Sequence, residues 1–327
     1  MEVRTNATLL KALKDSDVWR IFDREAARMS HAYLVLSEDK LALEQLLLLM
    51  CARAYCPTVC LSCAECRKVF GRNKVDVSEP NPEGETIKAE KAQDIVEDAM
   101  LGSLEGGKKI YVLRNMHLQT ERVQNILLKT LEEPNANVLF LLSAEREKGV
   151  LPTILSRVKT LTLTPFSEEQ TVAILEAEGI ATSAVFAKAA MGNLTLACEL
   201  GRDEDYFALV DEVVDVLAGL NRVAEVPFYL YRPIFAKDSL AKTLDVLELA
   251  VKDVMFVKEG VEEFVVYRDK LPVYRRIAPL YPVRSLPMIL DIINESKLRV
   301  AAYCTAVNVA DNLLLTMLEV KHQCAQS

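Results

Sequence analysis

The sequence predicts an α/β fold with a mostly parallel sheet, followed by an all-helical C-terminal part. Two patterns support this prediction: short apolar runs alternate with helical segments over the first half of the chain, and long segments with helical spacing fill the last third. A chain of 327 residues with 51% hydrophobic content is long for one compact unit and has ample core material, so we expect two or three domains.

The first predicted strand is the apolar run 32–36, which is followed, after the polar segment 37–40, by a helical run that continues to Tyr55. A strand, a turn and a helix in this order open an α/β unit. Further short apolar or β-branched runs, each suited to a buried strand, occur at 110–113, 138–142 and 160–163. The alternation predicts a mostly parallel sheet that is covered by helices on both faces.

The rest of the chain is expected to be helical. Ser167, with Gln170 three residues later, forms a capping-box pattern that starts a small helical unit from about 166 to 202. Leucines and valines spaced three and four apart between 240 and 254 predict a long helix in the last third. The pattern from about 288 to 320 is too apolar for a solvated helix pair, and it predicts core or an oligomer interface.

Charge and hydropathy argue against two classes of protein. The net charge of −8, from 39 basic and 47 acidic side chains, disfavours strong independent binding to nucleic acid, which depends on phosphates neutralised by Lys and Arg. The apolar stretch 41–50 is interrupted by Glu44 and Gln45 and is shorter than the roughly 20 residues that span a bilayer. Met1–Asn6 contain charges and precede no apolar signal region, so we expect no secretory signal, no membrane contact and a cytoplasmic location.

Three segments carry a resemblance to a known family. Residues 31–34 are similar to the strand that enters a phosphate-binding loop, residues 124–134 (QNILLKTLEEP) to a signature helix, and residues 151–157 (LPTILSR) to the motif after it. Through these segments, in this order and spacing, the chain resembles the bacterial DNA polymerase III clamp-loader subunits of the AAA+ class over roughly residues 1–210.

The resemblance implies a three-part architecture. A RecA-like AAA+ domain is expected at 1–165, with a zinc module inserted at about 51–66. A small helical lid domain is expected at 166–205, and an all-α collar domain, which would hold an oligomer together, at 206–327. The alternation of predicted strands and helices in the first half fits the AAA+ domain, and the helical last third fits the collar domain.

The family's ATP site is degenerate in this chain. A phosphate-binding loop needs glycines, a lysine and a hydroxyl residue, and the matching segment Leu36 to Glu44 lacks all of these at the required positions. Leu43 stands at the lysine position, Glu44 at the hydroxyl position, Arg114 and Asn115 at the acidic metal-binding pair, and Thr195 at the lid arginine. These losses predict no productive binding of ATP or Mg²⁺ and no ATPase activity of the chain's own.

Arg157 is the part of the ATP machinery that remains. In the family, the resemblance implies that the arginine of a Ser-Arg-Cys motif reaches the ATP of the neighbouring subunit; here Ser156 and Arg157 are present, and Val158 replaces the cysteine. An arginine supplied in trans stabilises the charge that develops on the transferred phosphoryl group, and it accelerates hydrolysis by roughly 10³ to 10⁵ in measured systems. We therefore predict that Arg157 acts in trans, with Ser156 supporting the motif.

Five of the eight cysteines lie between Cys51 and Cys66, which in a reducing compartment predicts a metal site rather than disulfides. Cys60, Cys63 and Cys66 form a Cys-x-x-Cys-x-x-Cys pattern suited to the tetrahedral thiolate shell of structural zinc. Cys56 is the predicted fourth ligand, because the proline after it ends the helix there. Cys51 is the alternative, since its gap of eight residues before Cys60 is the usual one in the family.

The resemblance implies a non-ATPase stator subunit of the DNA polymerase III clamp loader, which supports loading of the sliding clamp onto primed DNA in replication. The implied partners are ATPase subunits of the gamma/tau type, the delta subunit and, through the complex, the sliding clamp and primer–template DNA. Two alternatives are a diverged ATPase-type subunit that acts as a scaffold and a zinc-dependent DNA-binding protein. An active ATPase is a further alternative, which the absent loop lysine disfavours.

Overall fold

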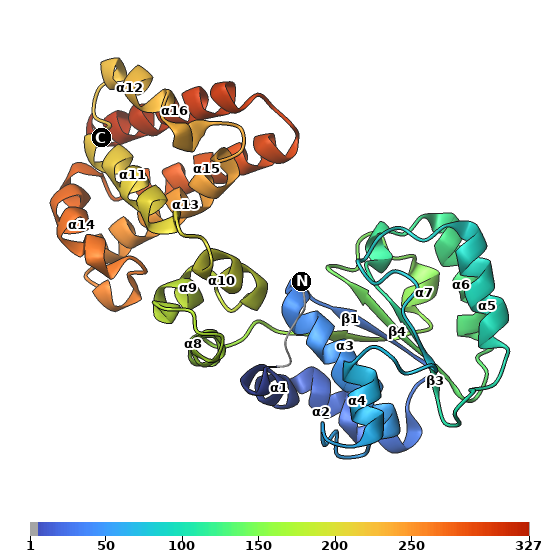
Figure 1. Cartoon of the computed structure of the whole chain (residues 1–327). Helices are drawn as coiled ribbons and strands as arrows, with labels where there is room; N and C mark the ends of the chain where they lie inside the picture. The colour runs from blue at the N-terminus through green and yellow to red at the C-terminus, as the bar shows by residue number, and fades with distance from the viewer. Residues whose placement is uncertain (1–5, 327) are drawn as a thin grey trace. The chain divides into compact units, whose positions relative to one another are not determined.

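The computed structural model describes residues 6–326 and divides the chain into two compact units, Met1–Glu199 and Leu200–Ser327. The first unit contains the sheet with its helices, and the second is helical (Figure 1). Residues 1–5, which belong to the segment expected to lack a secretory signal, lie outside the described residues, as does Ser327. No helix within residues 6–326 is both long enough and apolar enough to cross a membrane.

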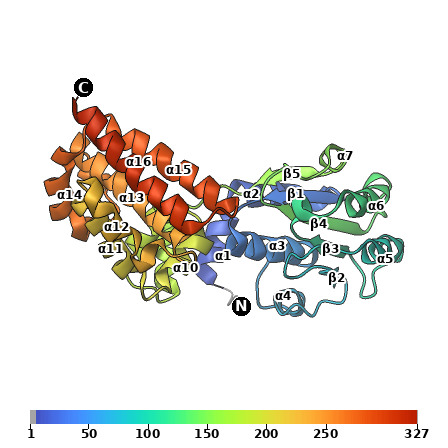
Figure 2. The ribbon, with the colours of Figure 1, turned by 90° about the horizontal axis from the view of Figure 1, so that it is seen from above.

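The sheet of the first unit is fully parallel, with the strand order β2-β3-β4-β1-β5 (Figure 2). Its strands are β1 (Ala32–Leu36), β2 (Val77–Ser78), β3 (Lys109–Leu113), β4 (Val138–Ala144) and β5 (Lys159–Thr162). Every residue of β1, β3 and β4 is buried, as expected for parallel strands covered on both faces. The four predicted strands are confirmed, whereas β2, with two residues, is too short to produce an apolar pattern.

Helices cover both faces of this sheet. The first unit contains α1 (Ala7–Lys14), α2 (Asp17–Arg24), α3 (Lys40–Tyr55), α4 (Ala64–Phe70), α5 (Ala89–Ala99), α6 (Glu121–Glu132), α7 (Pro152–Leu155), α8 (Glu168–Ala177), α9 (Ser183–Ala189) and most of α10 (Leu194–Gly201). Apolar side chains of α5 and α6, among them Val96 and Leu127, pack on one face against Tyr111 and Phe140. α3, which buries ten of its residues, lies on the other face with α1, α2 and α4 (Figure 1).

The helices α8 to α10 follow the last strand and form the expected small helical unit. α8 begins with the predicted capping box: Ser167 Oγ accepts a hydrogen bond from Gln170 N at 3.2 Å, and Gln170 Oε1 accepts one from Ser167 N at 3.0 Å. The loop between α9 and α10 returns to the start of α8, where Phe166 N donates to Gly192 O at 3.1 Å. The division at residues 165 and 205 remains a proposal, since the two compact units separate at residue 199 instead.

The described residues of the second unit, 200–326, form only helices and the turns between them. They are α11 (Tyr206–Gly219), α12 (Val226–Leu230), α13 (Leu240–Glu259), α14 (Leu271–Ile277), α15 (Ser285–Ala301) and α16 (Ala306–Gln326), with short 3-10 turns between several of them. The long helix predicted around 240–254 is α13. The apolar pattern at 288–320 separates into α15 and α16, which bury Ile289, Ile293, Leu313 and Leu314 inside this unit. Much of that pattern is therefore core.

Candidate functional site

The phosphate-loop position lies between β1 and α3, at the carboxyl edge of the parallel sheet, where open α/β sheets bind their ligands. β1 ends at Leu36 and α3 begins at Lys40, so three residues make the whole connection. Ser37 N donates to Ala144 O at 3.0 Å, and Asp39 N donates to Ser37 Oγ at 3.1 Å. This connection is short and fixed by these hydrogen bonds, unlike a loop whose glycines let backbone N–H groups wrap around phosphates.

The structure brings together Glu44 and Arg114, the residues at the hydroxyl and acidic-pair positions. Arg114 Nε donates to Glu44 Oε2 at 2.8 Å, and Arg114 Nη2 donates to Glu44 Oε1 at 2.7 Å. The same Nη2 donates to Glu79 Oε2 at 2.5 Å, as does Arg72 Nη1, also at 2.5 Å. Arg72 Nη2 is also paired with Glu44. Glu44, Arg114, Arg72 and Glu79 thus form a closed, electrically balanced cluster, which we call the ion-pair cluster.

Electrostatics keeps the ion-pair cluster charged although Arg114 is buried and Glu44 and Glu79 are partly buried. Burial alone would raise the pKa of Glu44, but its hydrogen bonds and the positive charges of Arg114 and Arg72 hold the pKa below its ordinary value. Both oxygens of Glu44 accept from guanidinium groups. Because P-loop enzymes hold Mg²⁺ between the loop hydroxyl and the acidic residue at the end of a strand, the cluster puts an arginine–carboxylate pair where the metal would be held.

The backbone at the end of β3 is fixed by Asn81, which is fully buried. Asn81 Oδ1 accepts from Arg114 N at 2.9 Å, and Asn81 Nδ2 donates to Arg114 O at 2.8 Å. Asn115 adopts a left-handed conformation with φ of 52°, and its Nδ2 donates to Gly84 O at 3.0 Å. Sequence reasoning missed Asn81, Arg72 and Glu79; the opposite charges of Glu44 and Arg114 were the one available signal.

Removal of one charged side chain from the ion-pair cluster should destabilise the first unit. Glu44→Ala is expected to lower the free energy of unfolding by about 3 kcal/mol, because it leaves a buried guanidinium short of its counter-charge. Trp19, the one tryptophan of the chain, is buried in the first unit, so its fluorescence in urea reports the unfolding of that unit. Asp94→Ala on the exposed side of α5 is the control, with a change below about 0.5 kcal/mol. Equal stability of the two variants would contradict the assignment.

Arg157 follows the short helix α7 and is accessible, with 35% of its side chain exposed. Its Nη1 donates to Thr153 O at 2.9 Å and to Ser156 Oγ at 3.0 Å, and its Nη2 is 2.7 Å from Glu132 Oε1. Ser156 Oγ also donates to Thr153 O at 3.1 Å. Ser156 therefore contacts the guanidinium group, and its role as a supporting residue stays a prediction; the contact of Glu132 was not anticipated.

The signature helix positions the arginine segment through Gln124, which is 1% exposed. Gln124 Oε1 accepts from Leu151 N at 2.8 Å, and its Nε2 donates to Gly149 O at 2.8 Å. The same amide nitrogen donates to Gln119 O at 3.0 Å. One buried amide of α6 thus fixes the chain just before α7, which explains physically why the two resembling segments occur together.

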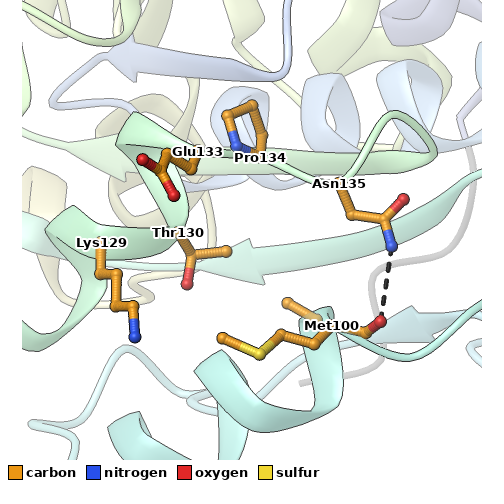
Figure 3. A pocket seen from close by; sticks show the side chains of 7 residues that line it. Met100, Lys129, Thr130, Glu133, Pro134 and Asn135 are labelled. Atoms are coloured by element: carbon orange, nitrogen blue, oxygen red, sulfur yellow. Dashed lines mark hydrogen bonds between the residues drawn. The ribbon is translucent and has the colours of Figure 1, made fainter.

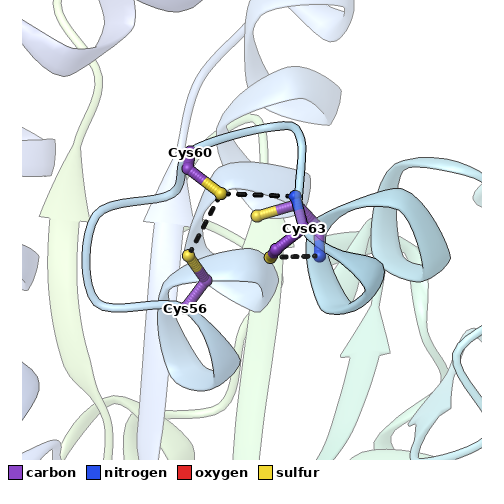
Figure 4. A group of neighbouring side chains, drawn as sticks. Cys56, Cys60 and Cys63 are labelled. Carbon is purple, nitrogen blue, oxygen red and sulfur yellow. Dashed lines mark hydrogen bonds between the residues drawn. The ribbon is translucent and has the colours of Figure 1, made fainter.

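Cys56, Cys60, Cys63 and Cys66 converge, with their sulfur atoms all within 4.8 Å of one another (Figure 4). The Sγ atoms of Cys56 and Cys60 are 3.8 Å apart, close to the spacing of about 3.8 Å between two sulfurs of a tetrahedron with Zn–S of about 2.3 Å. Cys51 is instead fully buried within α3, where burial raises the pKa of its thiol. The geometry thus brings in Cys56, the predicted fourth ligand, and not Cys51. The donor set fits structural zinc.

Local hydrogen bonds prepare these sulfurs to act as ligands. Cys63 N donates to Cys60 Sγ and Cys66 N donates to Cys63 Sγ, each at 3.4 Å. Hydrogen bonds from Ser62 and Cys63 lower the pKa of the Cys60 thiol to about 6, which favours the thiolate that a metal binds. Val59 and Leu61 have φ values of 44° and 61°, a left-handed conformation that is unusual for a β-branched residue such as valine. The turn is held in a costly conformation around the cluster.

A cavity of about 260 Å³ lies between the C-terminal ends of α5 and α6, near Met100, Lys129 and Asn135 (Figure 3). Asn135 Nδ2 donates to Met100 O at 3.5 Å across it. The cavity lies just before β4 begins, at the amino edge of the sheet, whereas open α/β sheets bind ligands at the carboxyl edge. We assign it no function.

A parallel sheet of this order, with helices on both faces and three short helices after its last strand, defines an AAA+ α/β protein. Residues 15–167 match a family model described as DNA polymerase III, delta subunit. A DNA polymerase III subunit delta' of Bacillus subtilis (strain 168) is 26% identical over 305 residues, which cover 90% of this chain and 93% of that protein. The matched family model and these relatives support the assignment of this chain as a delta-prime subunit of DNA polymerase III.

Other relatives match shorter stretches of the chain. A subunit delta' of Haemophilus influenzae is 31% identical over 144 residues, which cover 42% of this chain and 44% of that protein. A subunit tau of Salmonella typhimurium is 32% identical over 148 residues, which cover 44% and 23%. Among solved structures, a gamma subunit-related protein of Thermotoga maritima has a TM-score of 0.46 and 15% identity, covering 93% of this chain and all of that one.

Proposed function

We propose that this chain is a non-ATPase stator subunit of a DNA polymerase III clamp loader, which donates Arg157 to the ATP site of a neighbouring ATPase subunit. The observation that carries the proposal is a contrast within one unit. The chain's own nucleotide position contains the ion-pair cluster, in which Glu44 and Arg114 neutralise each other. Arg157, in the same unit, is partly exposed and is preoriented by Ser156 and Glu132.

The proposed mechanism in trans follows from this arrangement. Besides Thr153 and Ser156, the Arg157 guanidinium contacts the exposed carboxylate of Glu132, and a phosphate group of a neighbour can replace that carboxylate at little cost. Planar guanidinium groups bind phosphate oxygens through two parallel hydrogen bonds. A preoriented arginine then stabilises the charge on the transferred phosphoryl group without reorganisation at the moment of reaction. No ATP or Mg²⁺ is productively bound by this chain itself in the proposal.

The proposed zinc at Cys56, Cys60, Cys63 and Cys66 is structural. Four thiolates complete a tetrahedral shell and leave no open position for a substrate or water. The metal would stabilise the segment between α3 and α4, which is short and has little core of its own. Zinc would therefore contribute to folding and not to hydrolysis.

The proposed partners are ATPase subunits of the gamma/tau type and the delta subunit, with the sliding clamp and primer–template DNA reached through the complex in the cytoplasm. Residues 206–327 would serve as the collar that joins the subunits. Lys109 is paired with Asp98 at 2.7 Å and Arg114 belongs to the ion-pair cluster, so neither is free to contact DNA phosphates. DNA contact through the complex is consistent with the acidic net charge of the chain.

Copy number tests the proposal directly. Native mass spectrometry of the purified assembly is expected to find one copy of this chain beside several ATPase subunits. Several copies per assembly would support the scaffold alternative instead. The isolated chain is expected to bind neither Mg²⁺–ATP in equilibrium titrations nor DNA in a salt-dependent manner. Tight binding of Mg²⁺–ATP would indicate an active ATPase. Salt-sensitive binding of DNA would indicate a zinc-dependent DNA-binding protein.

A further inference from the structure

Asp39 joins two helices that lie far apart in the sequence. Its Oδ1 accepts from Ala42 N in the first turn of α3 at 3.1 Å. The same carboxylate accepts from the first residues of α10: Leu194 N donates to Oδ2 at 2.6 Å, and Thr195 N donates to Oδ1 at 3.2 Å. Asp39 is buried, with 7% exposure. One carboxylate thus caps α3 and also binds the start of α10.

Thr195 closes the arrangement from the other side. Its Oγ1 donates to Asp39 Oδ1 at 2.7 Å and accepts from Leu41 N at 2.8 Å. Each helix therefore satisfies a backbone donor of its first turn with a side chain of the other helix. These donors have no partner within their own helix, so the exchange removes a cost that each end would otherwise bear. Thr195 is the residue that stands where the family has its lid arginine.

The charge of Asp39 matches its position. Helix N-termini carry a partial positive charge, and in P-loop proteins the phosphates of the nucleotide bind at the N-terminus of the helix after the first strand. Here the Asp39 carboxylate supplies the negative charge at that helix, α3, and at α10 together. An anion that belongs to the chain is thus placed where a bound nucleotide would otherwise bridge the sheet and the lid.

We propose that Asp39 and Thr195 form a permanent latch that fixes the helices α8 to α10 to the sheet, so that the position of the lid no longer depends on nucleotide. The latch rests on contacts within the first unit, and it holds whether or not Arg157 acts on a neighbour's ATP. A weaker, exposed hydrogen bond accompanies it, from Asn6 Nδ2 at the start of α1 to Glu178 Oε1 after α8, at 2.6 Å. Loss of the latch should therefore loosen the lid without unfolding the unit.

Asp39→Ser separates the two roles of Asp39. Serine is a good N-cap for α3, but its shorter side chain cannot reach α10. Hydrogen–deuterium exchange of the full chain is expected to show exchange about tenfold faster or more in peptides that cover 190–199, the equivalent of one lost hydrogen bond to a charged group. Peptides from β1 and β4 should exchange as in the wild type. Thr195→Val is expected to give the same local pattern.

Glu38→Ala is the matched control, because Glu38 is the exposed neighbour of Asp39 in the same connection. It should leave exchange at 190–199 unchanged. Unchanged exchange at 190–199 in Asp39→Ser would overturn the latch. A uniform increase across β1, β4 and the lid would also overturn it, because Asp39 would then stabilise the whole unit and not the attachment of the lid.

Discussion

Arg157→Ala is expected to slow ATP hydrolysis at the neighbouring subunit's site by about 10³-fold or more in a reconstituted clamp loader. The substitution removes the guanidinium that would stabilise charge on the transferred phosphoryl group. Arg157 is half-exposed and held by Glu132, so its loss leaves the core of this chain intact. Because one ATP site would lie beside this subunit, single-turnover hydrolysis should resolve a slow fraction, while DNA-stimulated ATPase and clamp-loading rates fall.

Two further variants separate the role of Arg157 from a loss of positive charge. Arg157→Lys keeps the charge but loses the planar fork of donors, so it should recover only a small part of the rate. Arg24→Ala removes an exposed arginine at the end of α2 and should leave hydrolysis unchanged. Unaltered ATPase and clamp-loading rates with Arg157→Ala would show that the arginine has no role in trans, even if the chain proves to be a single-copy subunit.

The sequence was sufficient for those features that depend on local pattern. β1, β3, β4 and β5 were predicted because each is a continuous buried run, and the capping box of α8 is encoded in two residues. The choice of Cys56 over Cys51 followed from the helix end before Pro57, and the structure has α3 end at Tyr55. The departures from the family's nucleotide-binding motif were also readable, because single positions of a motif carry the chemistry; the loss of ATP binding stays a prediction.

The features that fill the lost site could not be predicted in the same way. Arg72 comes from the segment after α4 and Glu79 from the end of β2, and only the folded sheet brings them to Glu44. The Asp39–Thr195 contact joins residues 156 positions apart. Such pairs depend on tertiary packing and leave no periodic signal. The sequence thus indicated which chemistry was missing, and the structure identified the charges that replaced it.

Substitution of single cysteines should distinguish the zinc ligands from Cys51, which is expected not to bind the metal. Cys56→Ser is expected to lose the bound zinc, because it breaks the four-sulfur shell, whereas Cys51→Ser should retain one zinc per chain. Elemental analysis of the purified proteins measures this. Loss of zinc from both variants would mean that Cys51 takes part in the site, and a wild-type protein without zinc would mean that the thiols are free.

Loss of zinc should also disrupt the ion-pair cluster. We expect this effect on stability to be larger than the local effect on the cysteine segment. Zinc-finger peptides gain about 10 to 16 kcal/mol from the metal, so a small module held by four thiolates is expected to loosen without it. The costly backbone at Val59 and Leu61 would then relax. Arg72 follows α4 after one glycine, so a mobile module would withdraw its guanidinium from Glu44 and Glu79.

This link between the zinc site and the ion-pair cluster predicts that loss of the metal lowers the free energy of unfolding of the whole first unit. After chelation of the metal, the free energy of unfolding reported by Trp19 is expected to fall by about 2 kcal/mol or more, since the partly buried carboxylates of Glu44 and Glu79 lose a counter-charge. Arg72→Met should reproduce much of this fall while it retains the zinc. Chelation that increases proteolysis at 56–70 but leaves the Trp19 transition unchanged would show that the metal stabilises its own segment alone. The expected result would instead make zinc part of what stabilises the ion-pair cluster.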